Sequence, residues 1–259
     1  MTRGPFSWLT RGMEGYDART YGDRIAGVYD EMYGELFDSD ATVARLAELV
    51  GDGRALELAV GTGRIALPLK ERGVDVTGIE ISEAMVEELR AKPGGTDIPI
   101  VMGDFGDVEV DGHFDLVFVV FNTLFALTSQ DDQVRCFANV ARHLTDRGVF
   151  VVEAFVPDST RFTRHQTVGV DALGLDRVHL EASRHNPVSQ IVESQHVVLR
   201  QDQPVEMYPV EIRYAYPGEL DLMARLAGLR LRDRWGGWNE EPFTSESKFH
   251  VSLYERAPR

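Results

Sequence analysis

The sequence contains a single cysteine, Cys136, among 259 residues. One cysteine cannot form a disulfide within the chain, and it excludes a zinc site built from several cysteines. Cys136 lies in a stretch with helical spacing of apolar residues, so we expect a buried structural thiol. Long hydrophobic runs are also missing. No stretch reaches the length of about 18 apolar residues that a membrane span requires, and residues 1–10 lack the apolar run of a signal peptide. We therefore expect a soluble, cytoplasmic protein with no membrane partner.

Basic residues are scarce relative to acidic ones. Lys and Arg total 27 against 42 Asp and Glu, which gives a formal net charge of −15. Nucleic-acid binding needs clustered basic side chains to neutralise phosphates, so this balance argues against a nucleic-acid partner. The chain is 43% hydrophobic and 27% charged, which is typical of a globular protein. Its length suits one large domain, or one domain with an insertion, around a real core.

Strand patterns alternate with helical patterns through the first two thirds of the chain. Helical spacing is also present ahead of the first strand, at residues 21–33 and 40–50. This alternation predicts the α/β class, with a doubly wound parallel sheet. The expected strands are residues 55–60, 74–79, 98–102, 114–120 and 149–153, separated by helices at residues 64–72, 82–91 and 130–144.

The pattern changes after Pro157. Residues 160–216 show strand-like segments without helices between them, so we expect a small antiparallel β insertion beside the main sheet. A helix at residues 218–226 and two final strands then bring the main sheet to seven strands. The expected division is an N-terminal helical segment (1–40), a core (41–159 and 217–259) and the β-rich insertion (160–216).

A glycine-rich turn, Gly61-x-Gly63-x-x-Ala66, follows the first strand and opens a helix. Glycine lets a ligand approach the backbone closely, and the start of a helix favours anions. The pattern also fits the dinucleotide fingerprint of a dehydrogenase, and a tight turn with no ligand.

Acidic residues follow the same sheet edge. Glu57 lies inside an apolar strand, where a carboxylate is costly unless a cation or hydrogen-bond donors satisfy it. Glu80 ends the second strand, where it can accept bonds from ribose hydroxyls. Asp104 ends the third strand, beside Phe105, where a carboxylate can accept from an exocyclic amine and a ring can cover an adenine. All three acids are expected at the carboxyl ends of the strands, where folds of this kind bind ligands.

This series of motifs resembles the class I S-adenosylmethionine-dependent methyltransferases. The resemblance spans about residues 50–156 and rests on residues 57–63, Glu80, Asp104 and the strand at 114–121. It implies a Rossmann-like seven-stranded sheet with the last strand antiparallel, and S-adenosylmethionine as cofactor. It also implies a glycine loop under the methionine part, Glu80 on the ribose and Asp104 near the adenine. The implied cofactor contacts are Tyr21, Tyr29, Glu57, Ala59, Gly61, Gly63, Arg64, Glu80, Ile81, Met85, Gly103, Asp104, Phe105, Phe121 and Asn122.

A narrower resemblance is to small N-methyltransferases of actinobacterial antibiotic pathways. These include enzymes that dimethylate nucleotide-linked amino sugars and lincosamide N-methyltransferases. The resemblance rests on the leader at residues 21–30, the run at 121–125 and the position of the β-rich insertion. In such enzymes N-terminal tyrosines close over the cofactor and face the acceptor. This implies that residues 1–40 form a lid, with Tyr21 and Tyr29 as catalytic residues; the alternative is an ordinary amphipathic helix whose tyrosines cover the sheet. Phe121, at the end of the fourth strand, is the third expected catalytic residue.

Methyl transfer to an amine is an in-line displacement, which depends on alignment and the exclusion of water more than on a strong base. Phe121 is expected to shape the acceptor channel. Asn122 either bonds a ligand or serves in a turn. Phe125, His185 and Arg213 are expected substrate contacts, although Arg213 also fits a solvated face. No His, Asp or Glu spacing matches a metal motif, so we expect no metal.

We therefore expect an S-adenosylmethionine-dependent N-methyltransferase that acts on a small amine-bearing metabolite, such as an amino sugar or an antibiotic intermediate. Small-molecule O-methylation is the close alternative. A nicotinamide-dependent oxidoreductase and a non-catalytic cofactor-binding protein are further alternatives. The acceptor, the number of methyl groups and the oligomeric state, including a homo-oligomer, are left open.

Overall fold

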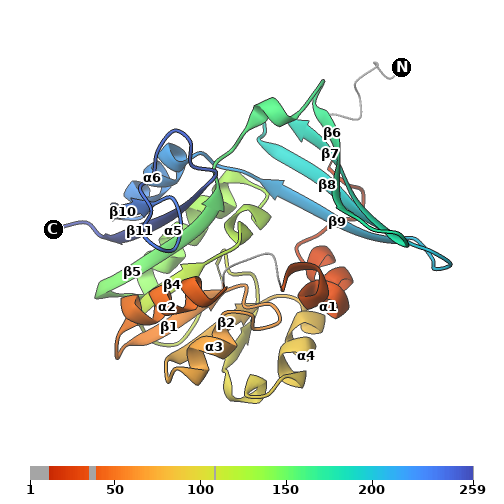
Figure 1. Ribbon diagram of the computed structural model, residues 1–259. Helices are drawn as coiled ribbons and strands as arrows, with labels where there is room; N and C mark the ends of the chain where they lie inside the picture. The colour runs from red at the N-terminus through yellow and green to blue at the C-terminus, as the bar shows by residue number, and fades with distance from the viewer. Residues whose placement is uncertain (1–11, 35–38, 108, 259) are drawn as a thin grey trace.

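A computed structural model describes residues 12–34, 39–107 and 109–258. The predicted lid residues 1–11 and 35–38 therefore lie outside the described residues. The chain forms two sheets (Figure 1). A seven-stranded sheet is flanked by helices, and a four-stranded sheet projects from one side of it. None of the described helices is long and apolar enough to cross a membrane.

The larger sheet has the strand order β10-β11-β5-β4-β1-β2-β3. Neighbouring strands pair in parallel except around β11, which pairs antiparallel with both β5 and β10. The expected doubly wound sheet with an antiparallel last strand is confirmed. Its strands are β1 (Arg54–Leu58), β2 (Asp75–Glu80), β3 (Ile100–Met102), β4 (Phe114–Val119), β5 (Leu144–Phe155), β10 (Leu229–Trp235) and β11 (Phe249–Arg256).

Helices cover both faces of this sheet because its central strands are apolar on both sides. On β4, Val117 and Val119 face one core cluster, which includes residues of α5 and α6. Leu116 and Phe118 face the other, which includes residues of α2 and α3. The helices are α1 (Thr20–Tyr33), α2 (Ser39–Val50), α3 (Ala66–Glu71), α4 (Glu83–Ala91), α5 (Gln130–His143) and α6 (Pro217–Leu226). Cys136 is fully buried on α5, as expected for a structural thiol.

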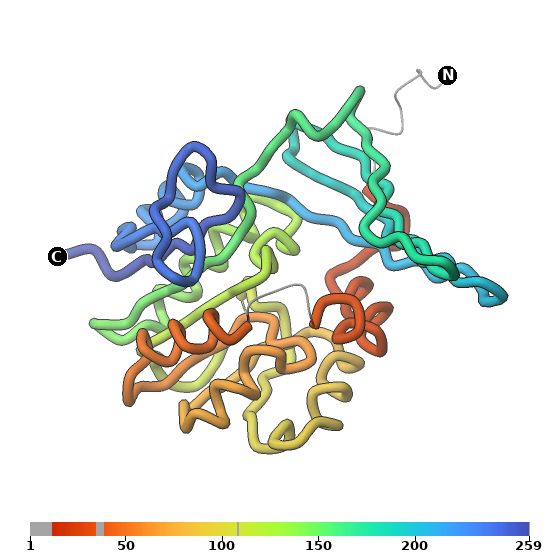
Figure 2. The backbone as a smooth tube through the Cα atoms, in the orientation of Figure 1, coloured from red at the N-terminus to blue at the C-terminus, as the bar shows by residue number. Residues whose placement is uncertain are grey.

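The smaller sheet is antiparallel, in the order β6-β7-β8-β9. Its strands are β6 (Gln166–Leu173), β7 (Arg177–Asn186), β8 (Ile191–Arg200) and β9 (Glu206–Arg213). The sequence patterns missed β6. This edge strand exposes most of its side chains and buries none of them, although Val168 and Val170 occupy alternate positions. Two long hairpins extend away from the larger sheet, and β9 returns the chain toward α6 (Figure 2).

Helix α1 lies between the two sheets. It packs on α4 and on β9, and its buried Ile25 shares a cluster with Val198 of β8. Polar contacts fix it to the larger sheet: the Ser82 hydroxyl donates to Asp23, at 2.6 Å, and the Thr62 hydroxyl donates to Asp30, at 2.7 Å. The helix therefore covers the carboxyl edge of β1 and β2 (Figure 1).

Candidate active site

A cavity of about 290 Å³ lies under α1 at the carboxyl ends of β1, β2 and β4. Ten residues that the sequence predicted as cofactor contacts line it. They are Tyr21, Tyr29, Ala59, Gly61, Glu80, Ile81, Met85, Phe105, Phe121 and Asn122. The strand ends meet here because parallel strands point their carboxyl ends to the same edge.

The glycine turn after β1 adopts left-handed backbone conformations. Gly61 has φ +56° and Gly63 has φ +81°, which L-residues with a side chain rarely adopt. A Cβ on Gly61 would project into open space, whereas one on Gly63 would lie 3.0 Å from Leu67 and Leu89. Gly61 thus leaves the cavity floor bare for a ligand, and Gly63 permits tight packing of the turn.

Glu80 closes the floor of the cavity. Its carboxylate accepts hydrogen bonds from the backbone N–H groups of Gly61, Ile81 and Ser82, each at 2.9 Å. Burial raises the pKa of Glu80, and the three donors oppose that effect. The side chain is held rigidly and keeps acceptor capacity on Oε2, which receives only the Gly61 bond in the structure.

Glu57 lies one layer deeper, behind the cavity. It is buried, and its Oε2 has no hydrogen-bond partner among the described residues. Burial raises the pKa of Glu57 to about 8, although the Arg64 guanidinium and the Ala66 N–H oppose the shift. A cationic ligand group near Oε2 would remove the cost of this unpaired atom.

The end of β3 supplies the adjoining wall. Phe105 lines the cavity, while the Asp104 carboxylate accepts a bond from the Gly106 N–H, at 2.8 Å. Gly103 donates its N–H to the Glu80 carbonyl, at 2.9 Å. Gly103 and Asp104 are thus fixed beside the cavity without being among its lining residues.

An aromatic group forms the roof. The hydroxyls of Tyr21 and Tyr33 are hydrogen-bonded to each other. The Tyr33 ring lies 5.1 Å from that of Tyr29 and 5.4 Å from that of Phe121. Arg64 hydrogen-bonds Tyr29 and lies over the Phe121 ring, 4.9 Å from its centroid. Burial raises the pKa of Tyr29 to about 12, so its hydroxyl keeps its proton at neutral pH.

Phe121 and Asn122 both have left-handed backbones, with φ of 62° and 64°. Such a pair is strained and persists only where its surroundings enforce it. The Phe121 N–H donates to Glu153 Oε2, at 2.9 Å, and the Phe155 N–H donates to Asn122 Oδ1, at 2.6 Å. Trp238 Nε1 donates to the other Glu153 oxygen. Asn122 therefore lines the cavity while its side-chain oxygen fixes the end of β5.

A second cavity of about 350 Å³ adjoins the first along the four-stranded sheet. Phe155, His196, Val210 and Ile212 line both cavities. The second cavity also contains Glu181, whose carboxylate accepts bonds from Ser183, at 2.8 Å, and Ser194, at 2.9 Å.

Burial raises the pKa of Glu181, but the hydroxyls of Ser183 and Ser194 and the nearby Arg161 outweigh it and hold that pKa below its usual range. A wider open groove of about 770 Å³ on β6–β8 contains none of the strand-end residues. The two smaller cavities therefore form the candidate site.

The three predicted substrate residues lie behind these cavities and are absent from the described lining. Phe125 is fully buried and packs edge-on against Phe155, with ring centroids 5.1 Å apart. His185 is stacked on Phe162, with ring centroids 4.4 Å apart, and its Nε2 lies 3.0 Å from the Tyr214 hydroxyl.

Arg213 is 6% exposed. Its guanidinium donates to Gln133 of α5, at 2.6 Å, and to Gln190, at 2.8 Å, and it forms an ion pair with Glu219, at 2.6 Å. These contacts join β9 to α5 and α6. The structure therefore gives Arg213 a connecting position and no contact with the cavities.

Sequence reasoning did not select several lining residues. Phe155 ends β5, whereas His196, Val210 and Ile212 reach the site only because the four-stranded sheet folds over it. Apolar and polar residues alternate along residues 205–212, which places Val210 and Ile212 on one face of the strand. This alternation is the sequence signal that could have selected them. The sequence of the strand itself does not indicate which of its two faces lies toward the cavity.

Comparisons with known proteins agree with this geometry. A family model described as a methyltransferase domain matches residues 55–148. The cypemycin N-terminal methyltransferase of a Streptomyces species is 30% identical over 245 residues, covering 88% of this chain and 98% of that protein.

Solved structures give the same result. The CcbJ methyltransferase from Streptomyces caelestis has a TM-score of 0.88 at 39% identity and covers 94% of this chain and 100% of that one. CalS10, an amino pentose methyltransferase from Micromonospora echinaspora solved with S-adenosylmethionine bound, has a TM-score of 0.67 at 20% identity and covers 87% of this chain and 96% of that one; at this identity it supports the fold alone. The chain belongs to the S-adenosylmethionine-dependent methyltransferases.

Proposed function

We propose that this enzyme transfers the methyl group of S-adenosylmethionine to the amine nitrogen of a small metabolite, such as an amino sugar or an antibiotic intermediate. The observation that carries the proposal is the carboxylate of Glu181 in a cavity that adjoins the cofactor-sized cavity. The printed names of relatives support the choice of nitrogen. They include the cypemycin N-terminal methyltransferase and an N,N-dimethyltransferase for a dTDP-linked amino sugar from Saccharopolyspora spinosa.

The residues of the first cavity fit the cofactor. Gly61 leaves open space above the turn, Glu80 keeps an acceptor site for ribose hydroxyls, and Phe105 offers a ring to an adenine face. The unpaired Oε2 of Glu57 suits the methionine ammonium group, either directly or through a water molecule. When bound, the cofactor supplies an electrophilic methyl on a sulfonium.

The aromatic roof suits that sulfonium. Phe121, Tyr29 and Tyr33 form contacting rings, and cations are attracted to ring faces. Because Tyr29 keeps its proton at neutral pH, we assign it to positioning and not to proton removal. The half-buried roof also excludes water from the displacement.

The second cavity suits an amine. Glu181 is held by two hydroxyl donors on neighbouring strands, so its orientation is fixed before an acceptor arrives. It can bind an ammonium group or a sugar hydroxyl of the acceptor, while the neutral amine that reacts lies nearer the shared residues Phe155 and His196. Alignment of that amine with the methyl group supplies most of the rate, and no strong base is required.

Product mass spectrometry tests this proposal. The enzyme is incubated with S-adenosylmethionine and a panel of amino sugars, amino-acid-derived amines and matched hydroxyl analogues. Methylation of amines, and not of the hydroxyl analogues, is expected. Methylation of hydroxyl groups alone would overturn the assignment to nitrogen.

A paired variant tests the role of Glu181. Glu181→Gln should raise the KM for the amine at least tenfold and leave the affinity for S-adenosylhomocysteine unchanged. Glu193→Gln is the matched control, because Glu193 is an acid on β8 that pairs with Arg184 and lies outside both cavities. Equal effects of the two changes would refute the role of Glu181.

A further inference from the structure

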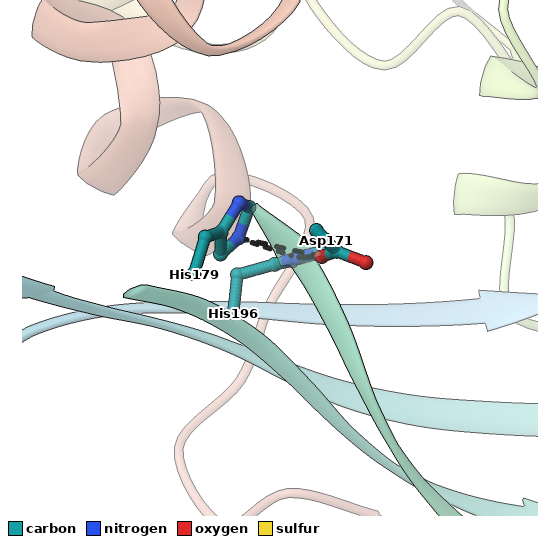
Figure 3. Close-up of side chains that lie close together, drawn as sticks. All are labelled: Asp171, His179 and His196. Carbon is teal, nitrogen blue, oxygen red and sulfur yellow. Dashed lines mark hydrogen bonds and ion pairs between the residues drawn. The ribbon is translucent and has the colours of Figure 1, made fainter. Parts of the chain in front are cut away.

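Two histidines and an aspartate meet on the inner face of the four-stranded sheet, beside α1. Asp171 comes from β6, His179 from β7 and His196 from β8, and Figure 3 shows the three side chains directed toward one another. His179 Nε2 lies 3.2 Å from His196 Nδ1. Asp171 Oδ2 lies 3.6 Å from each of these nitrogens.

The sheet register explains how three strands supply one cluster. Glu181 pairs with His196, and His179 pairs with Val198, so alternate residues of β7 and β8 share the inner face. The ladder between β6 and β7 shifts between Val170 and Ala172, which leaves Asp171 as a bulge residue beside His179. Bulges commonly redirect one side chain in this way.

The distances between the three atoms would allow all of them to bind one metal ion. A point equidistant from atoms with these separations lies about 2 Å from each, which is the usual length of a zinc bond to histidine nitrogen or carboxylate oxygen. Two imidazoles and one carboxylate are ligands that zinc, cobalt, nickel and ferrous iron accept, whereas magnesium and calcium prefer oxygen alone. Ordinary side-chain adjustment is enough to complete the geometry.

We propose that Asp171, His179 and His196 bind one divalent first-row transition-metal ion. The side chains of His179 and His196 are 12% and 16% exposed, while that of Asp171 is 39% exposed, so the ion has a route from solvent. Binding requires a lone pair on each of the two imidazole nitrogens, so the proton in the hydrogen bond between them moves to the other nitrogen of its own ring. Three protein ligands leave a position for water or another donor.

The site adjoins the acceptor cavity without being part of the cofactor contacts. His196 lines both cavities, so an ion bound to its Nδ1 fixes that ring in the wall facing the acceptor. The ion also ties together the three strands of the projecting sheet. The sequence spacing, residues 171, 179 and 196, matches no metal motif because each ligand comes from a different strand.

Calorimetry with zinc chloride on untagged, chelator-treated full-length protein tests the site. One equivalent should bind, and cobalt should give the intense visible absorption of a site with fewer than six ligands. His179→Ala and His196→Ala should each weaken zinc binding at least 100-fold. Asp171→Asn, which preserves shape, should weaken it at least tenfold. These losses follow from removing one of three ligands.

His113→Ala is the control, because His113 lies exposed in the loop before β4 and should leave binding unchanged. Circular dichroism of each variant establishes that it is folded. Two results would overturn the proposal. The first is that the wild-type protein shows no saturable zinc binding at one equivalent, which would mean that the cluster is only a hydrogen-bonded pair of histidines. The other is zinc binding that survives loss of His179 and His196 in folded protein.

Discussion

We predict that cofactor binding depends on pH through Glu57. In the ligand-free protein, burial raises the pKa of Glu57 to about 8, so the side chain is mostly protonated at pH 7. We proposed that the ionised form faces the methionine ammonium group. Binding must then remove the proton, and each pH unit below 8 costs about 1.4 kcal/mol. The Kd for S-adenosylhomocysteine should therefore rise about tenfold from pH 7 to pH 6.

Calorimetry measures this effect in two independent ways. At pH 7 binding should release about 0.9 protons per site, which is the protonated fraction expected for a pKa of about 8. The release appears as a dependence of the binding enthalpy on the ionisation enthalpy of the buffer. Glu57→Gln should bind more weakly and lose both the pH slope and the proton release. A wild-type Kd that stays constant between pH 6 and pH 7 would refute the reasoning.

The raised pKa of Glu57 also makes the stability of the ligand-free protein depend on pH, and the direction of that dependence can be derived. The folded pKa of about 8 exceeds the unfolded value of roughly 4.3, so between these pH values the folded state binds more protons. Stability relative to Glu57→Gln should therefore be greatest below pH 4.3 and decline as pH rises toward 8. Paired urea melts at pH 5 and pH 8 measure this difference, and a wild-type protein that gains stability relative to the variant would contradict it.

Three further predictions concern other residues of the site and its support. Glu80→Ala should weaken S-adenosylhomocysteine binding by about 1–3 kcal/mol, through loss of a charged acceptor; calorimetry giving wild-type affinity would argue against a ribose contact. Tyr21→Phe and Tyr29→Phe should lower kcat while largely preserving cofactor affinity, because the rings remain; single-turnover rates equal to wild type would remove the hydroxyls from the mechanism. Arg213→Ala should destabilise the fold by about 1–3 kcal/mol, because Gln133, Gln190 and the partly exposed Glu219 lose a charged donor, with little change in the KM for the acceptor; a raised KM in a fold of normal stability would restore the substrate role.

The geometry of the first cavity, which we propose for the cofactor, was predictable because it is encoded locally. Gly61, Glu80 and Asp104 each follow a strand, and parallel strands bring such positions to one edge whatever the loops between them do. The assignment of strands to a doubly wound sheet therefore also placed these residues together. Their individual hydrogen bonds, such as the three N–H groups on Glu80, were not readable from the pattern.

The acceptor half was harder to predict because it depends on contacts between distant segments. Arg213 appeared available to a ligand in the sequence, but its partner Gln133 lies 80 residues away and removes it from the site. His196 belongs to no metal motif in the sequence. Its position beside Asp171 requires a β-bulge in an edge strand whose side chains are mostly exposed.

The location of α1 between the two sheets has a kinetic consequence. Its contacts with the larger sheet include Asp30 with Thr62 and Lys92, and a close approach of Gly22 to Ser82. Its ion pairs with the smaller sheet, among the residues that the structure describes, are those of Glu31 with Arg177 and Arg200, and surface pairs of this kind contribute only about 0–1 kcal/mol.

We predict that the interface between α1 and the smaller sheet, which combines these ion pairs with the packing of Ile25 on Val198, opens first, and that α1 stays on the proposed cofactor cavity. We expect a compulsory order of events: S-adenosylmethionine binds before the acceptor, and the methylated product departs before S-adenosylhomocysteine. In steady-state assays S-adenosylhomocysteine should then compete with S-adenosylmethionine and be non-competitive against the amine. Raised salt should accelerate release of the methylated product more than release of S-adenosylhomocysteine, because it screens Glu31.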